Sequence, residues 1–363
     1  MDRREQLLKH ITKRQKGIEI GPWYAPLAAK REGYNCLSFD VFDTETLKRN
    51  AEEYPDVDNS CVSSIESVDI VGSSTEIYDI VAARGELLTF DYILSSHNFE
   101  HLPNPIKFLQ GCEKVLKLGG YLSMAVPDKR ACFDYFRPAS TLGSWLEAYT
   151  NNCIRPTAVQ FFEMGISYCT YSDGSDEEST SFSLANNPSK INPQMVLKKN
   201  FDTYMKRKGT EDVNYWDTHC WTFSPSSFYS ILLDTIFLKL VNFDVEEITE
   251  NNGNEFYVHL RKVESRTFED SEFYAKRESL LRSVIDETAY NSRYAYSLRD
   301  QLENSRLELV SLRDQLENAR LELVRLQAEN KSVKSSLTWK IGSPLRRLLT
   351  RRERRARRLR NLS

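Results

Sequence analysis

Three histidines stand in segments where they could move a proton to or from a bound substrate. His97 and His101 lie in SHNFEH, residues 96–101, and His219 lies in DTHCW, residues 217–221. An unperturbed imidazole has a pKa close to neutrality, so each ring could act as a general base. Each has a structural alternative: the ring of His101 could bond Glu100 or a backbone carbonyl, His97 could form part of the pocket wall, and His219 could be structural as well.

A second group of residues could hold a nucleotide-like cofactor. The segment KGIEIG, residues 16–21, reads as a short strand that carries Glu19 and ends at Gly21. Glycine has no Cβ to hinder the approach of a ligand to the backbone. Asp40 follows Gly21 by 19 residues, the distance at which α/β folds place the acid that bonds ribose hydroxyls. Asp43 is the alternative to Asp40.

The first turn argues against a dinucleotide cofactor. Gly21 is followed by Pro22 and Trp23, whereas a dinucleotide site has G-x-G-x-x-G to admit a pyrophosphate. Glu19 would repel that anion, yet a carboxylate there suits a cofactor with a cationic amino-acid group. A sulfonium cofactor therefore fits better, and a nicotinamide-dependent reductase stays a weaker alternative because Rossmann-like sheets are shared by many functions.

These residues require a sheet whose strands end at a common edge. Apolar runs predict strands at 17–20, 36–39, 67–71, 90–94 and 121–126, with helices at 5–14, 25–32 and 105–116. Continuous apolar runs separated by helices are typical of parallel strands that are covered on both faces. Two further runs, 241–248 and 255–260, flank an Asn-Gly pair, which predicts a hairpin. The fold class is therefore α/β, a mostly parallel sheet with an antiparallel hairpin at one edge.

The region after residue 263 predicts a coiled coil. The fourteen residues SLRDQLENSRLELV, 297–310, are repeated as SLRDQLENARLELV, 311–324. Fourteen residues make two heptads, and residues spaced by four and three form a coiled-coil seam. The seam consists of Leu298, Leu302, Ser305, Leu309, Leu312, Leu316, Ala319, Leu323, Leu326, Asn330, Val333 and Leu337. Asn330 falls on an a position of this seam, which favours a fixed register in a parallel dimer. We expect a homodimer or higher oligomer through residues 264–336.

Charge and composition limit the partners. Residues 343–363 contain nine arginines and one acid, and since the formal net charge of the chain is −3, the remainder is distinctly acidic. A leucine-containing basic end of this kind, within the tail 337–363, could lie on an anionic membrane surface. It could also be a solvated end, and nucleic acid is not an expected partner.

Cysteine usage and hydropathy predict the compartment. The seven cysteines are odd in number and form no CxxC pair, so we expect neither a disulfide framework nor a metal site. The sequence begins with charged residues and has no run of about 18 apolar residues. We therefore expect no signal peptide and no spanning helix, and a cytoplasmic protein that is at most peripheral at the inner face of the plasma membrane.

From about residue 16 to residue 260 the chain resembles the class I S-adenosylmethionine-dependent methyltransferases. The resemblance is to bacterial proteins with S-H-x-x-E-H followed by a G-G-x-L-x-x-A-V-P-D-K-R strand, which stand here at 96–101 and 119–130. It implies a Rossmann-like methyltransferase domain over 1–263, with 131–215 as an insertion that shapes the substrate pocket. S-adenosylmethionine is the implied cofactor.

The resemblance also implies roles for individual residues. Glu19 and Gly21 would line the methionine moiety with Pro22 beside them, and Asp40 would bond the ribose. Ser95, Ser96 and His97 would border the sulfonium and the methyl group. The chain departs from the family where PWY, residues 22–24, replaces a glycine-rich loop, and where Gly72-Ser73 replaces the acid that often follows the third strand.

The tail indicates a class of acceptor. SLTWKIGSPLRRL, residues 336–348, is similar to tails on bacterial glycosyltransferases and associated enzymes of cell-surface polysaccharide synthesis. This implies O-methylation of a sugar or glycan, with a small molecule as a further possibility for the acceptor. The alternative is a non-catalytic cofactor-binding or scaffold protein that recruits partners through its coiled coil.

Overall fold

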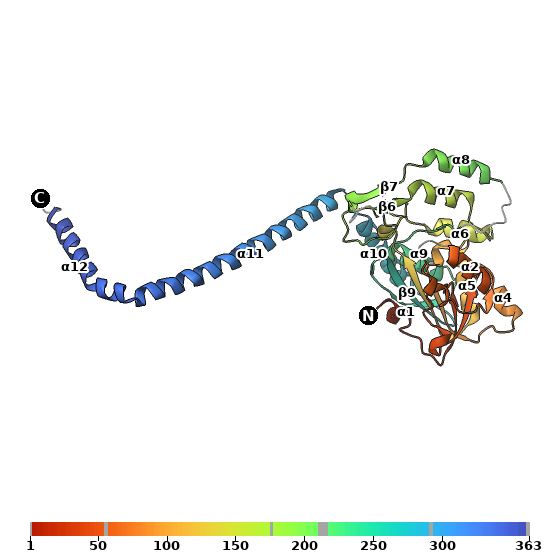
Figure 1. The fold of residues 1–363 in the computed structure, drawn as a ribbon. Coiled ribbons are helices and arrows are strands. Elements are labelled where there is room, and N and C mark those ends of the chain that lie inside the picture. Colours follow the sequence, from red (N-terminus) through yellow and green to blue (C-terminus); the bar gives the residue numbers. More distant parts are fainter. Residues whose placement is uncertain (1, 54–56, 175–176, 210–216, 290–292, 361–363) are drawn as a thin grey trace. The chain divides into compact units, whose positions relative to one another are not determined.

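The computed structural model describes residues 2–53, 57–174, 177–209, 217–289 and 293–360. Contacts between residues divide the chain into two compact units, Met1–Ser292 and Arg293–Ser363. The first unit holds the sheet, and the second consists of helices (Figure 1).

A seven-stranded sheet forms the centre of the first unit, in the order β3-β2-β1-β4-β5-β9-β8. The first five strands in the chain pair in parallel, and β9 pairs antiparallel with both β5 and β8. The strands are β1 Lys16–Ile20, β2 Asn35–Asp40, β3 Ile70–Val71, β4 Phe90–Ser96, β5 Leu116–Pro127, β8 Phe243–Ile248 and β9 Glu255–Lys262. The predicted fold class, a mostly parallel α/β sheet with an antiparallel hairpin at its edge, is confirmed.

Helices connect the strands and extend the unit. Those of the first unit are α1 Arg3–Leu7, α2 Thr44–Glu53, α3 Asn59–Val62, α4 Ile77–Ala83, α5 Pro105–Val115, α6 Leu142–Thr150, α7 Ala158–Ser167, α8 Leu197–Arg207, α9 Pro225–Phe237 and α10 Asp270–Ala289. The helix expected at 5–14 is shorter than predicted and ends at Leu7.

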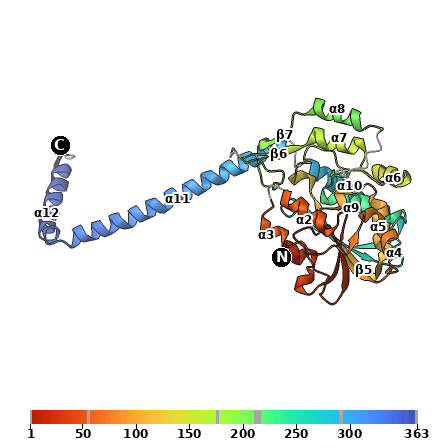
Figure 2. The same ribbon diagram turned by 45° about the vertical axis from the view of Figure 1, so that its right-hand side comes forward.

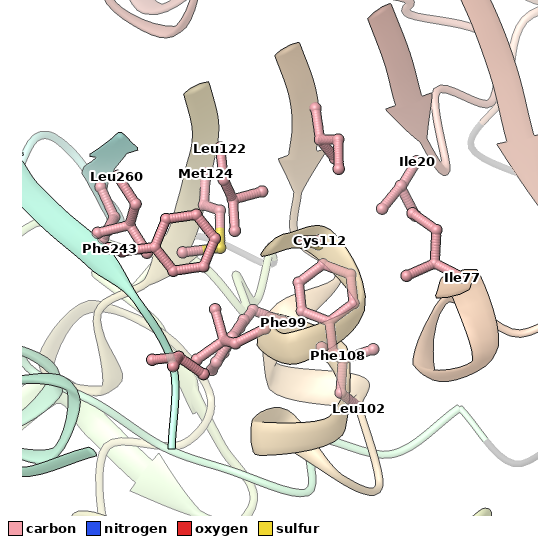
Figure 3. Close-up of a cluster of buried hydrophobic side chains, with 14 of the residues drawn as sticks. Ile20, Ile77, Phe99, Leu102, Phe108, Cys112, Leu122, Met124, Phe243 and Leu260 are labelled. Atoms are coloured by element: carbon pink, nitrogen blue, oxygen red, sulfur yellow. The ribbon is translucent and has the colours of Figure 1, made fainter. Parts of the chain in front are cut away.

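One face of the sheet carries most of the buried apolar side chains. Leu122 and Met124 of β5 point to this face because alternate residues of a strand share a side. They meet Phe99 and Phe108, whose rings lie edge to face with centroids 6.0 Å apart (Figure 3). Helices α4, α5 and α9 cover this face, and their apolar side chains pack against the strands.

The opposite face is covered by irregular backbone where a helix was expected. The prediction of a helix over 25–32 is wrong, since turns follow Gly21 and only a 3-10 turn, Lys30–Glu32, forms. Glu19 alternates onto this face, where its buried carboxylate accepts hydrogen bonds from the backbone N–H groups of Leu27 and Ala28, at 2.7 and 2.9 Å. Glu19 therefore supplies the hydrogen-bond acceptors for these two N–H groups of the loop.

The predicted insertion, 131–215, contains helices and a small sheet. Helices α7 and α8 lie side by side in both views (Figures 1 and 2). A two-stranded sheet of β6, Cys169–Tyr171, and β7, Ile191–Pro193, separates them in the chain. Residues 175–176 and 210–216 lie outside the described part.

Helix α10 packs against α9 and falls within the first unit, although we expected residues 264–336 to form one stalk. Phe273 and Leu280 are buried against Leu233, and the ring of Phe273 stacks on that of Phe237 with centroids 3.6 Å apart. The second unit consists of α11, Arg293–Ser335, and α12, Leu337–Arg360. In the part of the chain that the structure describes, no helix is long and apolar enough to span a membrane.

Candidate active site

A cavity of about 700 Å³ opens where β1, β2 and β4 end. Five of the residues singled out from the sequence line it: Gly21, Asp40, Ser96, His97 and His101. Cofactor pockets have volumes of about 300–1,000 Å³ and occur at the carboxyl ends of parallel strands. The cavity therefore has the size and the position of a cofactor site.

The register of the strands brings these residues together. Ile20 of β1 lies opposite Phe39 of β2 on one side and Ser95 of β4 on the other. The next residue of each strand segment, Gly21, Asp40 and Ser96, therefore reaches the same edge. Gly21 has a φ of +61°, and the position that its Cβ would occupy has no atom within 4 Å. The backbone there is open to a ligand.

Asp40, and not Asp43, lies on the cavity wall. Its side chain is buried, and Oδ1 accepts a hydrogen bond from the backbone N–H of Phe42 at 3.1 Å. Burial raises the pKa of Asp40, although the N–H groups of Phe42 and Val41 partly offset this effect. Asp43 is exposed and accepts from the backbone N–H of Thr46 at 2.8 Å, and this bond lowers its pKa. Asp43 caps α2, so Asp40 is the better candidate for the ribose.

Three of the predicted cofactor residues lie beside the main cavity. Glu19 and Pro22 line a smaller adjoining cavity of about 200 Å³, which shares Gly21 and Ser96 with the large one. Ser95 is buried, and its Oγ accepts a hydrogen bond from the side-chain amide of Asn98 at 3.1 Å. Burial raises the pKa of Glu19 despite its two backbone hydrogen bonds. These two hydrogen bonds tie its carboxylate to the loop after β1.

His97 belongs to a charged network that the sequence does not reveal. Its Nε2 lies 2.8 Å from Oε2 of Glu255, the first residue of β9, and Arg3 donates to Oε1 of the same carboxylate at 2.8 Å. Burial alone lowers the pKa of His97, but the carboxylates of Glu255 and Glu100 outweigh it and raise the pKa. The backbone of His97 has a φ of +48°, a left-handed conformation that is unfavourable for a residue other than glycine.

His101 and His219 stand together although more than one hundred residues separate them. Their rings are perpendicular with centroids 4.7 Å apart. His101 lines the cavity, whereas His219 is buried behind it, with Nδ1 2.5 Å from Oδ2 of Asp134. The pKa of Asp134 is lowered because His219 and Arg137 outweigh the effect of its burial. The structure thus brings all three predicted catalytic histidines to one region, and neither Asp134 nor Glu255 could be found from spacing.

Comparison with known families identifies the kind of domain. Residues 21–124, from the end of β1 to the middle of β5, match the methyltransferase domain family. The chain contains an S-adenosylmethionine-dependent methyltransferase domain. S-adenosylmethionine is the cofactor of such a domain, and the open backbone at Gly21 and the carboxylate of Asp40 on the cavity wall fit its methionine and ribose groups.

Solved structures resemble the methyltransferase domain and its surroundings only distantly. A Methanosarcina mazei SAM-dependent methyltransferase is 12% identical over 70% of this chain and 95% of that chain, with a TM-score of 0.33. A candidate methyltransferase from Listeria monocytogenes is 12% identical over 72% of this chain and 97% of that chain, with a TM-score of 0.37. A candidate Zn-dependent alcohol dehydrogenase from Rhodobacter sphaeroides is 13% identical over 72% of this chain and 89% of that chain, with a TM-score of 0.38. A search of curated proteins gives no significant match.

Replacing Asp40 tests its role in the methyltransferase domain. Asp40→Asn removes the negative charge of the hydrogen-bond acceptor, so we expect the Kd for S-adenosylmethionine to rise about tenfold in calorimetry. Asp43→Asn is the matched control, since asparagine still caps a helix and the side chain is exposed. Equal affinities of the two variants would rule out a ribose contact at Asp40.

Proposed function

We propose that the methyltransferase domain transfers a methyl group to a hydroxyl of a sugar or glycan acceptor in the synthesis of bacterial cell-surface polysaccharide. The observation that carries the proposal is His97 on the cavity wall, held by Glu255 at 2.8 Å. An alcohol is a poor nucleophile until its proton begins to leave, so O-methylation needs a base beside the acceptor. A histidine that is oriented by a carboxylate can supply that base.

His97 acts as the base in the proposed reaction. In the neutral ring, Glu255 accepts the proton on Nε2, which leaves the lone pair on Nδ1 of His97. The acceptor hydroxyl gives its proton to Nδ1. S-adenosylmethionine, when bound, would supply the electrophilic methyl group, which would pass from its sulfur to the acceptor oxygen and leave S-adenosylhomocysteine. The raised pKa of His97 favours the imidazolium that results.

The lining of the cavity favours a polyhydroxylated acceptor. Asn50 and Glu53 contribute an amide and a carboxylate to it. Such groups can pair with several hydroxyls at once, whereas an apolar acceptor would leave them without partners when they are covered. The resemblance of the tail to those of polysaccharide-synthesis enzymes points to the same class of acceptor.

Labelled S-adenosylmethionine tests the proposal directly. The purified full chain is incubated with the labelled cofactor and with fractionated extract of the source cell. We expect label in base-stable ethers of the glycan or lipid-linked sugar fraction. Label only in protein would contradict the sugar assignment, and binding of the cofactor without any transfer to an extract fraction would favour the scaffold alternative.

We further propose that α11 forms a coiled coil with a second copy of the chain. Leu302, Leu309 and Leu316 are more than half exposed in this 43-residue helix and lie on the predicted seam. A single helix of this length gains little stability from propensity alone and is normally held by packing of its apolar face. A second copy offers an identical seam.

Substitution on and off the seam tests the dimer. We expect Leu316→Lys to shift the full chain towards the monomer in light scattering, because a buried lysine opposes seam packing. Leu321→Lys is the matched control, since Leu321 is 61% exposed, compared with 55% for Leu316, and lies off the seam. If both variants keep the mass of the parent protein, the seam is not the contact.

We also propose that the basic end of the chain lies on the inner face of the plasma membrane, which would make the protein cytoplasmic and peripheral. In α12, Ile341, Leu345, Leu348 and Leu349 are exposed and share one face by helical spacing. Arg347, Arg351, Arg352, Arg354 and Arg355 of the same helix are exposed too. An apolar stripe beside arginines suits the boundary between anionic headgroups and acyl chains.

Vesicle binding tests the role of α12. The full chain should sediment with vesicles that contain anionic phosphatidylglycerol and should stay in solution with neutral phosphatidylcholine vesicles. Deletion of residues 337–363 should abolish the binding and leave the affinity for S-adenosylmethionine unchanged. Equal sedimentation of the truncated protein would contradict a membrane role for the tail.

A further inference from the structure

Glu100 has an unusual environment for a carboxylate. It lies in a 3-10 turn, Phe99–His101, and its side chain is fully buried. Among the described residues, neither carboxylate oxygen of Glu100 takes part in a hydrogen bond. An ionised carboxylate without partners in the interior costs several kcal/mol, so such groups are normally paired or bound to a metal. Within the described part of the chain, Glu100 therefore has no partner at hydrogen-bond distance, and the groups nearest to it that can carry a positive charge include imidazole rings.

Three imidazole nitrogens lie close to this carboxylate. Nδ1 of His97 and Nε2 of His101 each lie 3.6 Å from Oε1 of Glu100, and Nε2 of His219 lies 3.9 Å from it. These separations are too long for hydrogen bonds of about 2.7–3.2 Å. They do suit two ligands of one ion, because metal bonds of about 2.0–2.2 Å at tetrahedral or wider angles place ligand atoms roughly 3.4–4 Å apart. One ligand atom from each of the three residues lies within 4.8 Å of the others.

A carboxylate orients one of the two rings from the side away from Glu100. Nδ1 of His219 lies 2.5 Å from Oδ2 of Asp134, whereas Nδ1 of His101 lies 3.0 Å from the exposed Asp217 and forms no hydrogen bond. Histidines that bind metals usually give their other ring nitrogen to a carboxylate in this way, which fixes the tautomer and turns the remaining lone pair to the ion. Nε2 of His219 therefore presents its lone pair toward Glu100.

We propose that Glu100, His101 and His219 bind a divalent transition-metal ion, with zinc as the ion best suited to the set. Two imidazoles and one carboxylate form a recognised zinc ligand set that leaves a fourth position open. This inference replaces the expectation, drawn from cysteine spacing, that no metal is bound. The signal was invisible in the sequence because Glu100 and His101 are adjacent while His219 is contributed by a distant segment.

The site connects to the cavity through His101, which lies in both. The open position of the ion is therefore suited to an oxygen of a bound acceptor, whose proton a cation makes more acidic. This part of the inference rests on the proposed O-methylation, whereas the metal site itself does not. Binding of the ion can be measured without acceptor, cofactor or turnover.

Metal content tests the site. The full chain is treated with a chelator, dialysed and then titrated with zinc chloride. Unbound zinc is removed, and the zinc that stays bound is measured by elemental mass spectrometry. We expect one zinc ion per chain, and at least a hundredfold weaker binding for Glu100→Gln and for His219→Asn. His10→Asn, whose ring stacks on Tyr121 away from the three ligands, should bind zinc like the parent protein.

Cobalt gives a second measurement that does not depend on the folding of a variant. In the parent protein, one equivalent of cobalt chloride should produce the visible absorption of a four- or five-coordinate ion, and zinc should displace it. Failure of the apoprotein to take up zinc or cobalt, or unchanged binding by a folded Glu100→Gln variant, would overturn the metal site. Retained labelling of glycan in that case would leave the proposed methyl transfer standing.

Discussion

The candidate site depends on the hydrogen-bond register of three parallel strands. Because β1 lies between β2 and β4 and Ile20 is level with Phe39 and Ser95, the chain leaves all three strands at one edge. A shift of one residue would turn every side chain to the other face. The antiparallel pairing of β5 with β9 adds Glu255 opposite Pro127, at the same edge, where it reaches His97. One sheet register thus assembles residues from four separate stretches of sequence.

Residues 217–221 complete this edge by docking on the segment after β4. The backbone N–H of Trp221 donates to the carbonyl of Glu100 at 3.1 Å, and its indole N–H donates to the carbonyl of Leu102 at 2.5 Å. These bonds fix His219 beside His101. The predicted insertion contributes Asp134, which holds the ring of His219 from behind. The insertion therefore contacts the site indirectly, through His219. His101 connects the cavity to the buried Glu100, because it lines the one and lies beside the other.

The pattern of apolar residues and turn residues along the sequence was sufficient to predict the strands that carry the site. The apolar runs identified β1, β2, β4 and β5, and the Asn-Gly pair identified the hairpin. The helix expected over 25–32 did not form, and the backbone N–H groups of Leu27 and Ala28 bond instead to the carboxylate of Glu19, which lies in a strand. Such a bond depends on which face of the sheet the loop covers. Contacts of Glu255, Asp134 and His219 depend on tertiary pairing, so no spacing in the sequence indicates them.

S-adenosylmethionine is expected to bind where β1, β2 and β4 end, and a crystal structure of the full chain with S-adenosylhomocysteine would show whether it does. We expect the ribose hydroxyls within hydrogen-bond distance of Asp40, the amino-acid part above the backbone of Gly21, and the sulfur facing His97. S-adenosylhomocysteine bound in another cavity, or bound at this edge with its ribose turned away from Asp40, would show that the site is assigned wrongly.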